Sequence, residues 1–255
     1  PTRSDLGPAP AYPASNLGER VERLIARVES LADAMNMRFL YDPRRRLFTI
    51  GYNVGNGRFD SSYYDLLASE ARLASLVAIA RGDVPVEHWF ALGRFFGSAQ
   101  GHRVLFSWNG TMFEYLMPVL LTRSYRHTLL DEAHREAVRL QIEYGIHQRV
   151  PWGISESAFA AVDVNQVYQY QAFGVPDLGI KRGLADDLVV APYASALALM
   201  VEPRPALANL RRLGSLELGG AYGYYESIDY TLRRQPKGHH GVVVRRDNEH
   251  ACRFG

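Results

Sequence analysis

The sequence predicts a mostly α-helical protein, and three observations lead to this prediction. Several segments of about 10 to 20 residues repeat apolar side chains at the three- and four-residue spacing of one helix face. No alternation of strand and helix patterns is visible, which argues against a TIM barrel or a Rossmann sheet. Long loops rich in glycine, proline and aromatic residues separate the helices. We therefore expect an array of helical hairpins that is either closed like an (α/α) barrel or left open.

The N-terminal region is expected to contain a helix followed by a small β-hairpin. Residues 17–36 place apolar side chains on one helix face. Residues 38–41 and 47–50 flank a Pro-Arg pair that is suited to the turn of a hairpin.

The strongest helical pattern covers residues 61–81, where Ser61 or Ser62 can cap the first turn and Gly82 follows the last. Glu70 shares its face of this helix with two leucines and a valine, at intervals of three and four residues. A buried ionised carboxylate is unfavourable unless it is paired. Glu70 therefore either has a disturbed pKa and takes part in chemistry, or pairs with an arginine of a neighbouring helix.

Further helical segments follow along the chain. They cover residues 86–96, 111–122, 129–147, 185–200 and 204–213. Pro118 is expected to bend the second of them, and residues 103–108 form an apolar turn or a short strand. The loops at 150–180 and 214–225 are too long and too apolar to be simple connections, and loops of this kind often carry a functional site.

Composition and charge favour a neutral ligand. The 255 residues are 47% hydrophobic, which is enough for a substantial core, and 29 Lys and Arg against 27 Asp and Glu leave a formal charge of +2. This balance gives no strong field to attract nucleic acid or an anionic membrane surface. Fifteen tyrosines and three tryptophans offer flat apolar faces with polar edges, which suit a polyol ligand and equally suit the edge of a core.

The sequence indicates neither a metal nor a cofactor. The single Cys252 excludes an intrachain disulfide, and His239, His240 and His250 have no acidic neighbours at metal-ligand spacing. No Gly-x-Ser-x-Gly or Walker A motif is present, and the Gly-Asn-Gly triplet at residues 55–57 favours a tight turn over a dinucleotide site. No stretch of about 18 uncharged apolar residues and no signal-peptide pattern occurs, so we expect a soluble chain without direct membrane contact.

A run at residues 150–157 is typical of a carbohydrate site. It places Glu156 close to Trp152 and a glycine and between two serines, of which Ser155 directly precedes the carboxylate. An indole can stack on a sugar ring, and cleavage of a glycosidic bond needs a nearby carboxyl group to move its proton. The structural alternative is that Ser155 and Glu156 only begin a short helix.

Glu114 follows Trp108 and Asn109, both of which suit a sugar ligand. Thr111 and Glu114 also have the spacing of a capping box, in which the glutamate has a structural role. Both alternatives stay open at this point.

Glu226 and Asp229 are three residues apart in a segment rich in tyrosine, with Tyr225 directly before the glutamate. On a helix they would share one face, where they could bind sugar hydroxyls or supply a second catalytic group. The alternative is that this acidic pair only complements a helix dipole.

Taken together, these motifs resemble the glucoamylase-like domain found in the middle of cyclic β-1,2-glucan synthases. The resemblance covers roughly residues 50–232 and rests on a series of matched stretches. These are Gly51 to Val54, Ser62 to Arg72, Ala80 to Pro85 with His88 and Trp89, Ser107 to Pro118, Pro151 to Ser157, Tyr168 to Tyr170 with Phe173 to Pro176, Ala191 to Tyr193, and Gly223 to Tyr230.

The resemblance implies an (α/α)6 barrel that acts on β-1,2-linked glucan as a retaining transglycosylase and cyclises the chain. Related endo-β-1,2-glucanases hydrolyse the same linkage, and a non-catalytic glucan-binding fragment is the remaining alternative. By position in the matched motifs, Glu156 is assigned as nucleophile and Glu70 as acid/base. Asp65, Tyr168 and Tyr193 are expected to contact the glucan together with the aromatic and polar residues named above.

The resemblance also suggests domain limits. Residues 1–15 have the composition of a proline-rich linker, residues 16–235 are expected to form a truncated glucoamylase-like domain, and residues 236–255 a divergent tail. A barrel of this type has twelve helices, whereas about eight are visible here. We therefore expect an incomplete all-α barrel with long aromatic loops and a small β-hairpin. Within a larger synthase it would lie beside other domains on the cytoplasmic face of the inner membrane.

Overall fold

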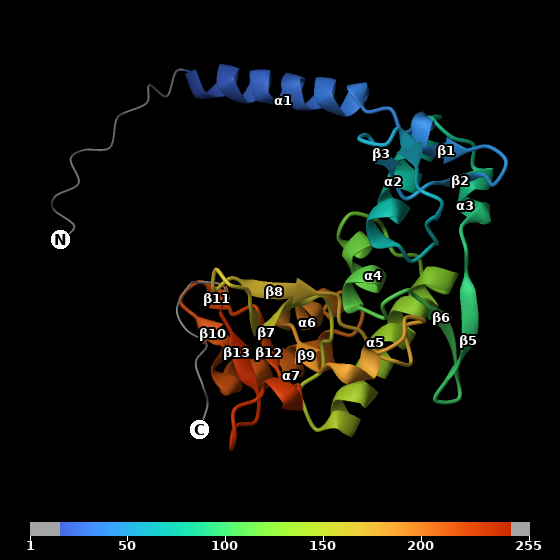
Figure 1. The fold of residues 1–255 in the computed structure, drawn as a ribbon. Helices are drawn as coiled ribbons and strands as arrows, with labels where there is room; N and C mark the ends of the chain where they lie inside the picture. The colour runs from blue at the N-terminus through green and yellow to red at the C-terminus, as the bar shows by residue number, and fades with distance from the viewer. Residues whose placement is uncertain (1–15, 246–255) are drawn as a thin grey trace.

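The computed structural model describes residues 16–245, and its architecture is mixed instead of all-α (Figure 1). Seven α-helices in this range alternate with short antiparallel strands, giving 42% helix and 20% strand. No barrel closes within the described part of the chain. The predicted all-α class and the predicted (α/α)6 barrel are therefore wrong. The expected linker at residues 1–15 and the last ten residues of the expected tail, 246–255, lie outside the described range.

Short paired strands explain this error. The two-stranded pairs are β1 (Tyr41–Asp42) with β2 (Leu47–Phe48), β3 (Tyr52–Asn53) with β4 (Arg58–Phe59), β5 (Phe95–Ala99) with β6 (His102–Phe106), β7 (Ser157–Val162) with β8 (Tyr168–Gln171), and β10 (Gly219–Gly220) with β11 (Gly223–Tyr224). A three-stranded sheet has the order β13 (Val242–Val244), β12 (Ser227–Asp229), β9 (Val189–Val190). Most of these strands are too short for an alternation of apolar and polar residues to be recognised. The β1–β2 pair confirms the predicted hairpin.

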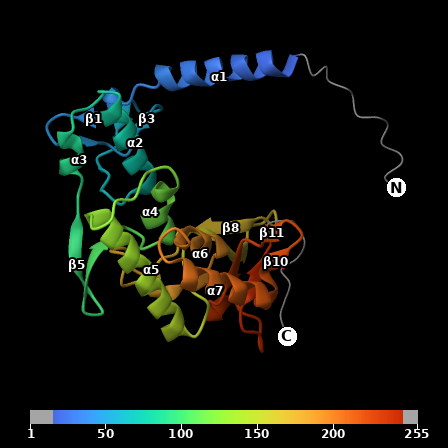
Figure 2. The ribbon, with the colours of Figure 1, turned by 180° about the vertical axis from the view of Figure 1, so that it is seen from behind.

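Helix α1 (Leu17–Ala34) confirms the helix predicted at residues 17–36 but does not pack on the core. None of its residues is buried, and Leu24 and Leu31 on its apolar stripe are 62% and 64% exposed. Figures 1 and 2 show α1 projecting from the rest of the molecule. Arg81 holds its C-terminal end, because the guanidinium donates to the carbonyls of Ala32 and Asp33 at 2.7 and 2.9 Å.

Helix α2 (Ser69–Ala80) begins later than the predicted helix of residues 61–81. Before it, Asp65 Oδ1 accepts the N–H groups of Leu67 and Ala68 at 2.8 and 3.0 Å. Such a turn satisfies the backbone without a helix, so the chain stays irregular up to residue 68. Gly82 follows the helix with a φ of 72°, in agreement with the predicted end.

The middle of the chain contains α3 (Glu87–Ala91), α4 (Met112–Leu116) and α5 (Leu129–Gln148). The predicted helix of residues 86–96 is too long, because its last residues enter β5. A 3-10 turn at Met117–Leu120 continues α4 and is the bend expected at Pro118. Helix α5 agrees with the prediction, and Thr128 caps it by accepting the Asp131 N–H at 3.3 Å.

The last helices, α6 (Pro192–Ala198) and α7 (Pro203–Leu213), each begin at a proline. Proline suits the first helical position because its missing N–H would be unpaired there. The prediction for residues 185–200 is right only in its second half, since β9 occupies part of the first. The main core lies between α4, α5, α6, α7 and the three-stranded sheet, with these residues fully buried: Met112, Tyr115, Ala137, Val190, Ala198.

Candidate active site

Residues 150–157 run through this core and are held by three elements. The fully buried Gln141 side chain of α5 accepts from Ile154 N and donates to Ile154 O, both at 2.7 Å. The same carbonyl accepts from Met112 N of α4 at 3.2 Å, and Ile154 forms a β-bridge with Val190 of β9. Glu156 therefore follows a segment whose backbone is fixed on several sides.

The residues next to Glu156 are fixed by a short chain of hydroxyl groups. Ser155 is fully buried and its Oγ accepts the Phe113 N–H of α4 at 3.0 Å. The Tyr193 hydroxyl of α6 lies 2.7 Å from Ser155 Oγ and 2.9 Å from the Glu156 carbonyl oxygen. Because a carbonyl can only accept, the phenol proton points to Glu156 O and Ser155 donates to the phenol. Burial raises the pKa of Tyr193, which keeps this proton in place.

The Glu156 carboxylate itself has few partners. It is half-buried, and the Tyr170 hydroxyl of β8 donates to its Oε2 at 3.4 Å. Burial raises the pKa of Glu156, the negative charge of Glu70 raises it further, and the Tyr170 hydrogen bond opposes both effects. No arginine or lysine among residues 16–245 forms an ion pair with it. Among the described residues, the Glu156 carboxylate thus has Tyr170 as its hydrogen-bond donor and no ion-pair partner.

Glu70 lies in the first turn of α2 and is exposed, so the expected burial of this side chain is wrong. Because α2 begins at Ser69, it turns a different face to the core. That face carries Arg72, which is fully buried and donates to the carbonyls of Glu114 and Tyr115 at 3.3 and 3.0 Å. The Ser69 hydroxyl donates to Glu70 Oε2 at 2.8 Å, and the expected arginine partner of Glu70 is not found among the described residues. Arg72 therefore fastens α2 to α4, and the Glu70 side chain of the same helix turn stays exposed.

Glu114 has the structural role that was left open as its alternative. The capping box with Thr111 is present, and Glu114 Oε2 accepts Thr111 N at 3.0 Å and Ser107 Oγ at 2.8 Å. Its Oε1 accepts the backbone and side-chain N–H groups of Asn109 at 3.1 and 3.3 Å. Asn109 is therefore committed to Glu114, while the adjacent Trp108 is 57% exposed.

Trp152 is a core residue, and the expected stacking of its ring on a sugar has no support. The side chain is 6% exposed and lies in the main core. It packs on Gly145 of α5, where an added Cβ would come within 2.8 Å of Trp152 Cβ. Asn209 of α7 donates to the Trp152 carbonyl at 2.7 Å. The whole residue thus anchors the segment before Glu156.

The segment with Glu226 and Asp229 is a strand, so the expected shared helix face does not exist. Asp229 is fully buried and pairs with Arg234 Nε at 2.6 Å, which makes it part of an internal ion pair. Glu226 is half-buried, accepts the Ala158 N–H at 3.3 Å, and its charge contributes to the raised pKa of Tyr193. Only Glu226 of this pair therefore borders the Glu156 group.

Three other predicted contacts have separate surroundings. Asp65 is half-buried and burial raises its pKa. Tyr168 lies on β8 two residues before Tyr170, so the two rings share a face of the strand. The Tyr225 ring lies under the Arg245 guanidinium, 4.5 Å from ring centre to Cζ.

Two residues that position the site were not assigned from the sequence. Tyr170 lies in a matched stretch, and its spacing of two from Tyr168 would have indicated a common strand face had a strand been expected there. Gln141 looks like an ordinary polar residue of an amphipathic helix. Only the fold shows that its amide binds both backbone groups of Ile154.

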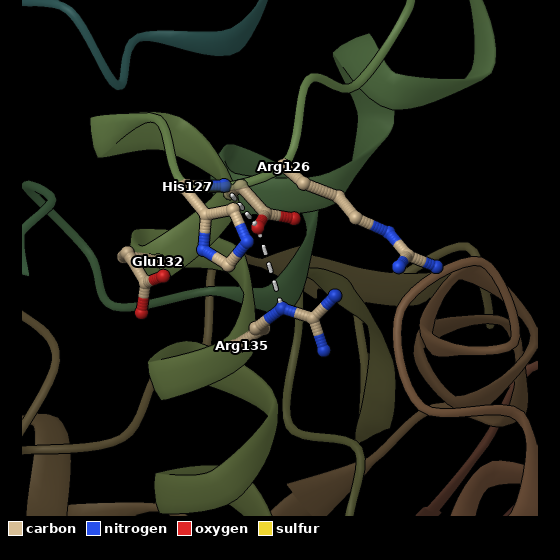
Figure 3. A pocket seen from close by; sticks show the side chains of 5 residues that line it. Arg126, His127, Glu132 and Arg135 are labelled. Atoms are coloured by element: carbon tan, nitrogen blue, oxygen red, sulfur yellow. Dashed lines mark hydrogen bonds and ion pairs between the residues drawn. The ribbon is translucent and has the colours of Figure 1, made fainter.

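Two cavities lie away from the Glu156 carboxylate. One of about 250 Å³ is lined by Arg126, His127, Asp131, Glu132 and Arg135 at the start of α5. Figure 3 shows three of these residues joined, since the His127 N–H and Arg135 Nε both contact the Asp131 carboxylate. The other, of about 220 Å³, includes Gln171, whose Cα pairs with that of Ser157, the residue after Glu156. The second cavity adjoins the strand pair that carries Tyr170.

Comparison with known proteins connects this chain to a family. Residues 62–246 match the family described as Putative glucoamylase. The chain is 48% identical over 229 residues to the cyclic beta-(1,2)-glucan synthase NdvB of Rhizobium meliloti (strain 1021), a match that covers 90% of this chain and 8% of NdvB. No helix among residues 16–245 is long and apolar enough to cross a membrane.

Two crystal structures share the fold. A putative glucoamylase from Bacteroides caccae ATCC 43185 has a TM-score of 0.60 at 14% identity, covering 85% of this chain and 56% of that one. A putative glucoamylase from Bacteroides fragilis NCTC 9343 has a TM-score of 0.58 at 17% identity, covering 82% and 53%. At such identities the likeness concerns the fold alone. The predicted resemblance to a glucoamylase-like domain of a cyclic β-1,2-glucan synthase is confirmed, and the chain belongs to the Putative glucoamylase family.

Proposed function

We propose that this chain is a carbohydrate-active domain that cleaves and re-forms β-1,2-glucosidic bonds, with Glu156 as nucleophile and Glu70 as acid/base. The observation that carries the proposal is the half-buried Glu156 carboxylate, which follows a backbone fixed by Gln141 and accepts a hydrogen bond from Tyr170. The linkage is taken from the name of the related synthase. The domain spans a small part of that protein, so its own activity needs a direct test.

The proposed reaction retains the anomeric configuration in two steps. In the first, a Glu156 carboxylate oxygen attacks the anomeric carbon, the glycosidic C–O bond breaks, and the Glu70 proton passes to the leaving oxygen. In the second, Glu70 takes the proton of an incoming sugar hydroxyl while that oxygen displaces Glu156. If the hydroxyl belongs to the same glucan chain, the product is a ring.

The environment of the pair supports this division of roles. Glu70 is exposed at the rim and can meet a leaving oxygen or an incoming hydroxyl. Glu156 is held by a rigid backbone, as an attacking group must be.

The test is to incubate the purified chain with linear β-1,2-glucan and analyse the products by mass. Cyclic products, lighter than the linear chains by one water, support transglycosylation. Shorter linear chains would show hydrolysis, and binding without products would leave only a glucan-binding fragment. Glu132→Gln is a matched control for Glu70→Gln, because both glutamates are exposed in the first turn of a helix.

A further inference from the structure

Helix α1 carries an apolar face that stays exposed throughout the described part of the chain. We propose that this face pairs with the same face of a second copy of the chain, so that two α1 helices form a short parallel coiled coil. Six apolar residues form the face, called here the apolar seam, and each is between 46% and 64% exposed: Leu17, Val21, Leu24, Val28, Leu31 and, directly after the helix, Met35.

The spacing of the apolar seam is that of a coiled coil. Its six residues follow one another at intervals of four, three, four, three and four residues. This is the heptad pattern, in which positions a and d face a partner helix. Position a is then occupied by Val21 and Val28, and position d is leucine throughout the helix. Because a β-branched residue at a combined with leucine at d favours two parallel strands, the residue types indicate one partner helix of the same kind.

The charges beside the apolar seam indicate the direction of the pair. Arg20 and Arg27 occupy position g, whereas position e holds Gly18, Ile25 and Ala32. In a parallel pair each g side chain lies beside an e residue of the other helix, so both arginines meet residues on which their apolar stems can pack. In an antiparallel pair g lies beside g, and the Arg27 side chains of the two copies would repel each other. The parallel pair is therefore favoured.

A lipid surface fits this helix less well than a second copy does. Helix α1 contains three arginines against four acidic residues, so its polar side has no excess of positive charge. Helices that lie on a membrane surface are typically rich in Lys and Arg on that side. Glu19 and Arg23, which form an ion pair at 3.7 Å, stand at positions f and c, away from the apolar seam. This charge pattern is typical of the outer surface of a coiled coil.

The fold leaves the apolar seam accessible to a partner. Figures 1 and 2 show α1 projecting from the rest of the molecule. Arg81 contacts the last turn through the carbonyls of Ala32 and Asp33, and the adjacent Leu31 is still 64% exposed. The seam is therefore open even where α1 joins the rest of the chain.

The length of the helix limits the strength of the pair. The 18 residues of α1 span about 27 Å at 1.5 Å per residue. Pairing two such helices buries about 1,000 Å² in total, which is at the lower limit of a specific interface. We therefore expect a reversible dimer that forms at high protein concentration.

The test is the mass of the full chain in solution, measured by analytical ultracentrifugation over a range of concentrations. We expect the mass of one chain at about 1 μM and that of two chains at about 100 μM. Leu24→Glu places two like charges opposite each other in the apolar seam and should raise the dissociation constant by at least about 30-fold. Since no residue of α1 is buried, this substitution leaves the core intact.

Ala26→Glu is the matched control, because it adds the same charge at position f of the same helix. Its dissociation constant should stay within about twofold of the wild type. Circular dichroism checks that both variants keep the helix content of the wild type.

Cross-linking tests the direction of the pair in a Cys252→Ser background, which lacks the single native cysteine. Leu17→Cys brings two thiols together in a parallel pair, whereas an antiparallel pair separates them by most of the length of the helix. We expect a disulfide-linked dimer to form at least about tenfold faster in Leu17→Cys than in Ala26→Cys, whose thiols point away from the apolar seam.

Three results would overturn the inference. A chain that stays monomeric at about 100 μM with α1 folded would assign the apolar seam to a different partner. A dimer that Leu24→Glu leaves intact would place the interface elsewhere, and equal cross-linking of Leu17→Cys and Ala26→Cys would exclude the parallel pair. None of these measurements uses a glucan, so their outcome is independent of the proposed function.

Discussion

The segments ending in Glu114 and Glu156 contain similar residue types, but they differ in which side chain is buried and which is exposed. Each places a tryptophan, a glycine and a hydroxyl residue shortly before a glutamate. In the first, Trp108 is 57% exposed while Glu114 is buried. In the second, Trp152 is 6% exposed while Glu156 is only half-buried. Similar local composition therefore does not determine which side chain faces solvent.

Hydrogen bonding separates the two glutamates. The Glu114 carboxylate accepts five hydrogen bonds, from Ser107, Thr111 and Asn109, and so stabilises the start of α4. Within residues 16–245 the Glu156 carboxylate accepts one long hydrogen bond, from Tyr170, and burial, followed by the negative charge of Glu70, raises its pKa. A carboxylate whose oxygens already accept several hydrogen bonds stabilises the fold. A carboxylate with few hydrogen bonds, held in a fixed position, is available for chemistry.

The largest expected effect is on turnover in Glu156→Gln. Loss of the proposed nucleophile should lower activity on linear β-1,2-glucan by about 10³-fold or more, because the amide cannot form the covalent intermediate. Product analysis by mass measures this loss, and thermal unfolding checks that the variant is folded. Activity within about tenfold of the wild type would place the nucleophile elsewhere.

The two tryptophans should differ in stability. Trp152→Ala is expected to lower the free energy of unfolding by about 3 to 5 kcal/mol, because it leaves a cavity in the main core. Trp108→Ala, at an exposed site, should change it by less than about 1 kcal/mol. Urea unfolding of both variants measures the difference. Equal losses would contradict the contrast between the two segments.

Glu114→Gln should destabilise the chain by about 2 to 3 kcal/mol. The amide supplies one acceptor oxygen where several donors now meet a carboxylate, and its NH₂ group faces donors of Ser107, Thr111 and Asn109. Glu132→Gln on α5 is the exposed control. The comparison of the two segments fails if Glu114→Gln unfolds at the same urea concentration as this control.

The smallest effect is the pH dependence of stability at Glu156. Its pKa in the fold is raised above the ordinary 4.5, so the folded state binds this proton more tightly than the unfolded state does. Ionisation of Glu156 should therefore destabilise the fold as pH rises above 4.5, with no penalty below it. Glu156→Gln should abolish this destabilisation, which we expect to be less than about 1 kcal/mol because solvent screens a half-exposed carboxylate. The free energy of unfolding of both proteins is measured at pH 4 and at pH 7. The prediction is contradicted if the wild type becomes more stable relative to the variant as the pH rises from 4 to 7.

Local signals in the sequence predicted what depends on neighbouring residues. The capping box of Thr111 and Glu114, the cap and length of α5, and the bend at Pro118 all follow from contacts within a few residues. Family membership followed from matched motifs. These features need no knowledge of the fold.

Features that depend on packing could not be predicted. The exposure of Glu70 depends on the start of α2, which the hydrogen bonds of Asp65 delay to residue 69. The burial of Trp152 depends on the space left by the missing side chain of Gly145. The position of Tyr170 depends on the pairing of β7 with β8, which the hydrophobic pattern of the sequence did not indicate. The fold class was wrong for the same reason, because strands of two or three residues carry no recognisable periodicity.

The central claim is that Glu156 is the nucleophile and Glu70 its acid/base partner. The most direct test is to trap the covalent intermediate in Glu70→Gln with a β-1,2-linked glucosyl fluoride, whose leaving group needs no acid. Without a base the intermediate should accumulate, and peptide mapping by mass spectrometry should find the glycosyl group on the peptide containing Glu156. A glycosyl group on another peptide, or rapid turnover without any adduct, would contradict the account.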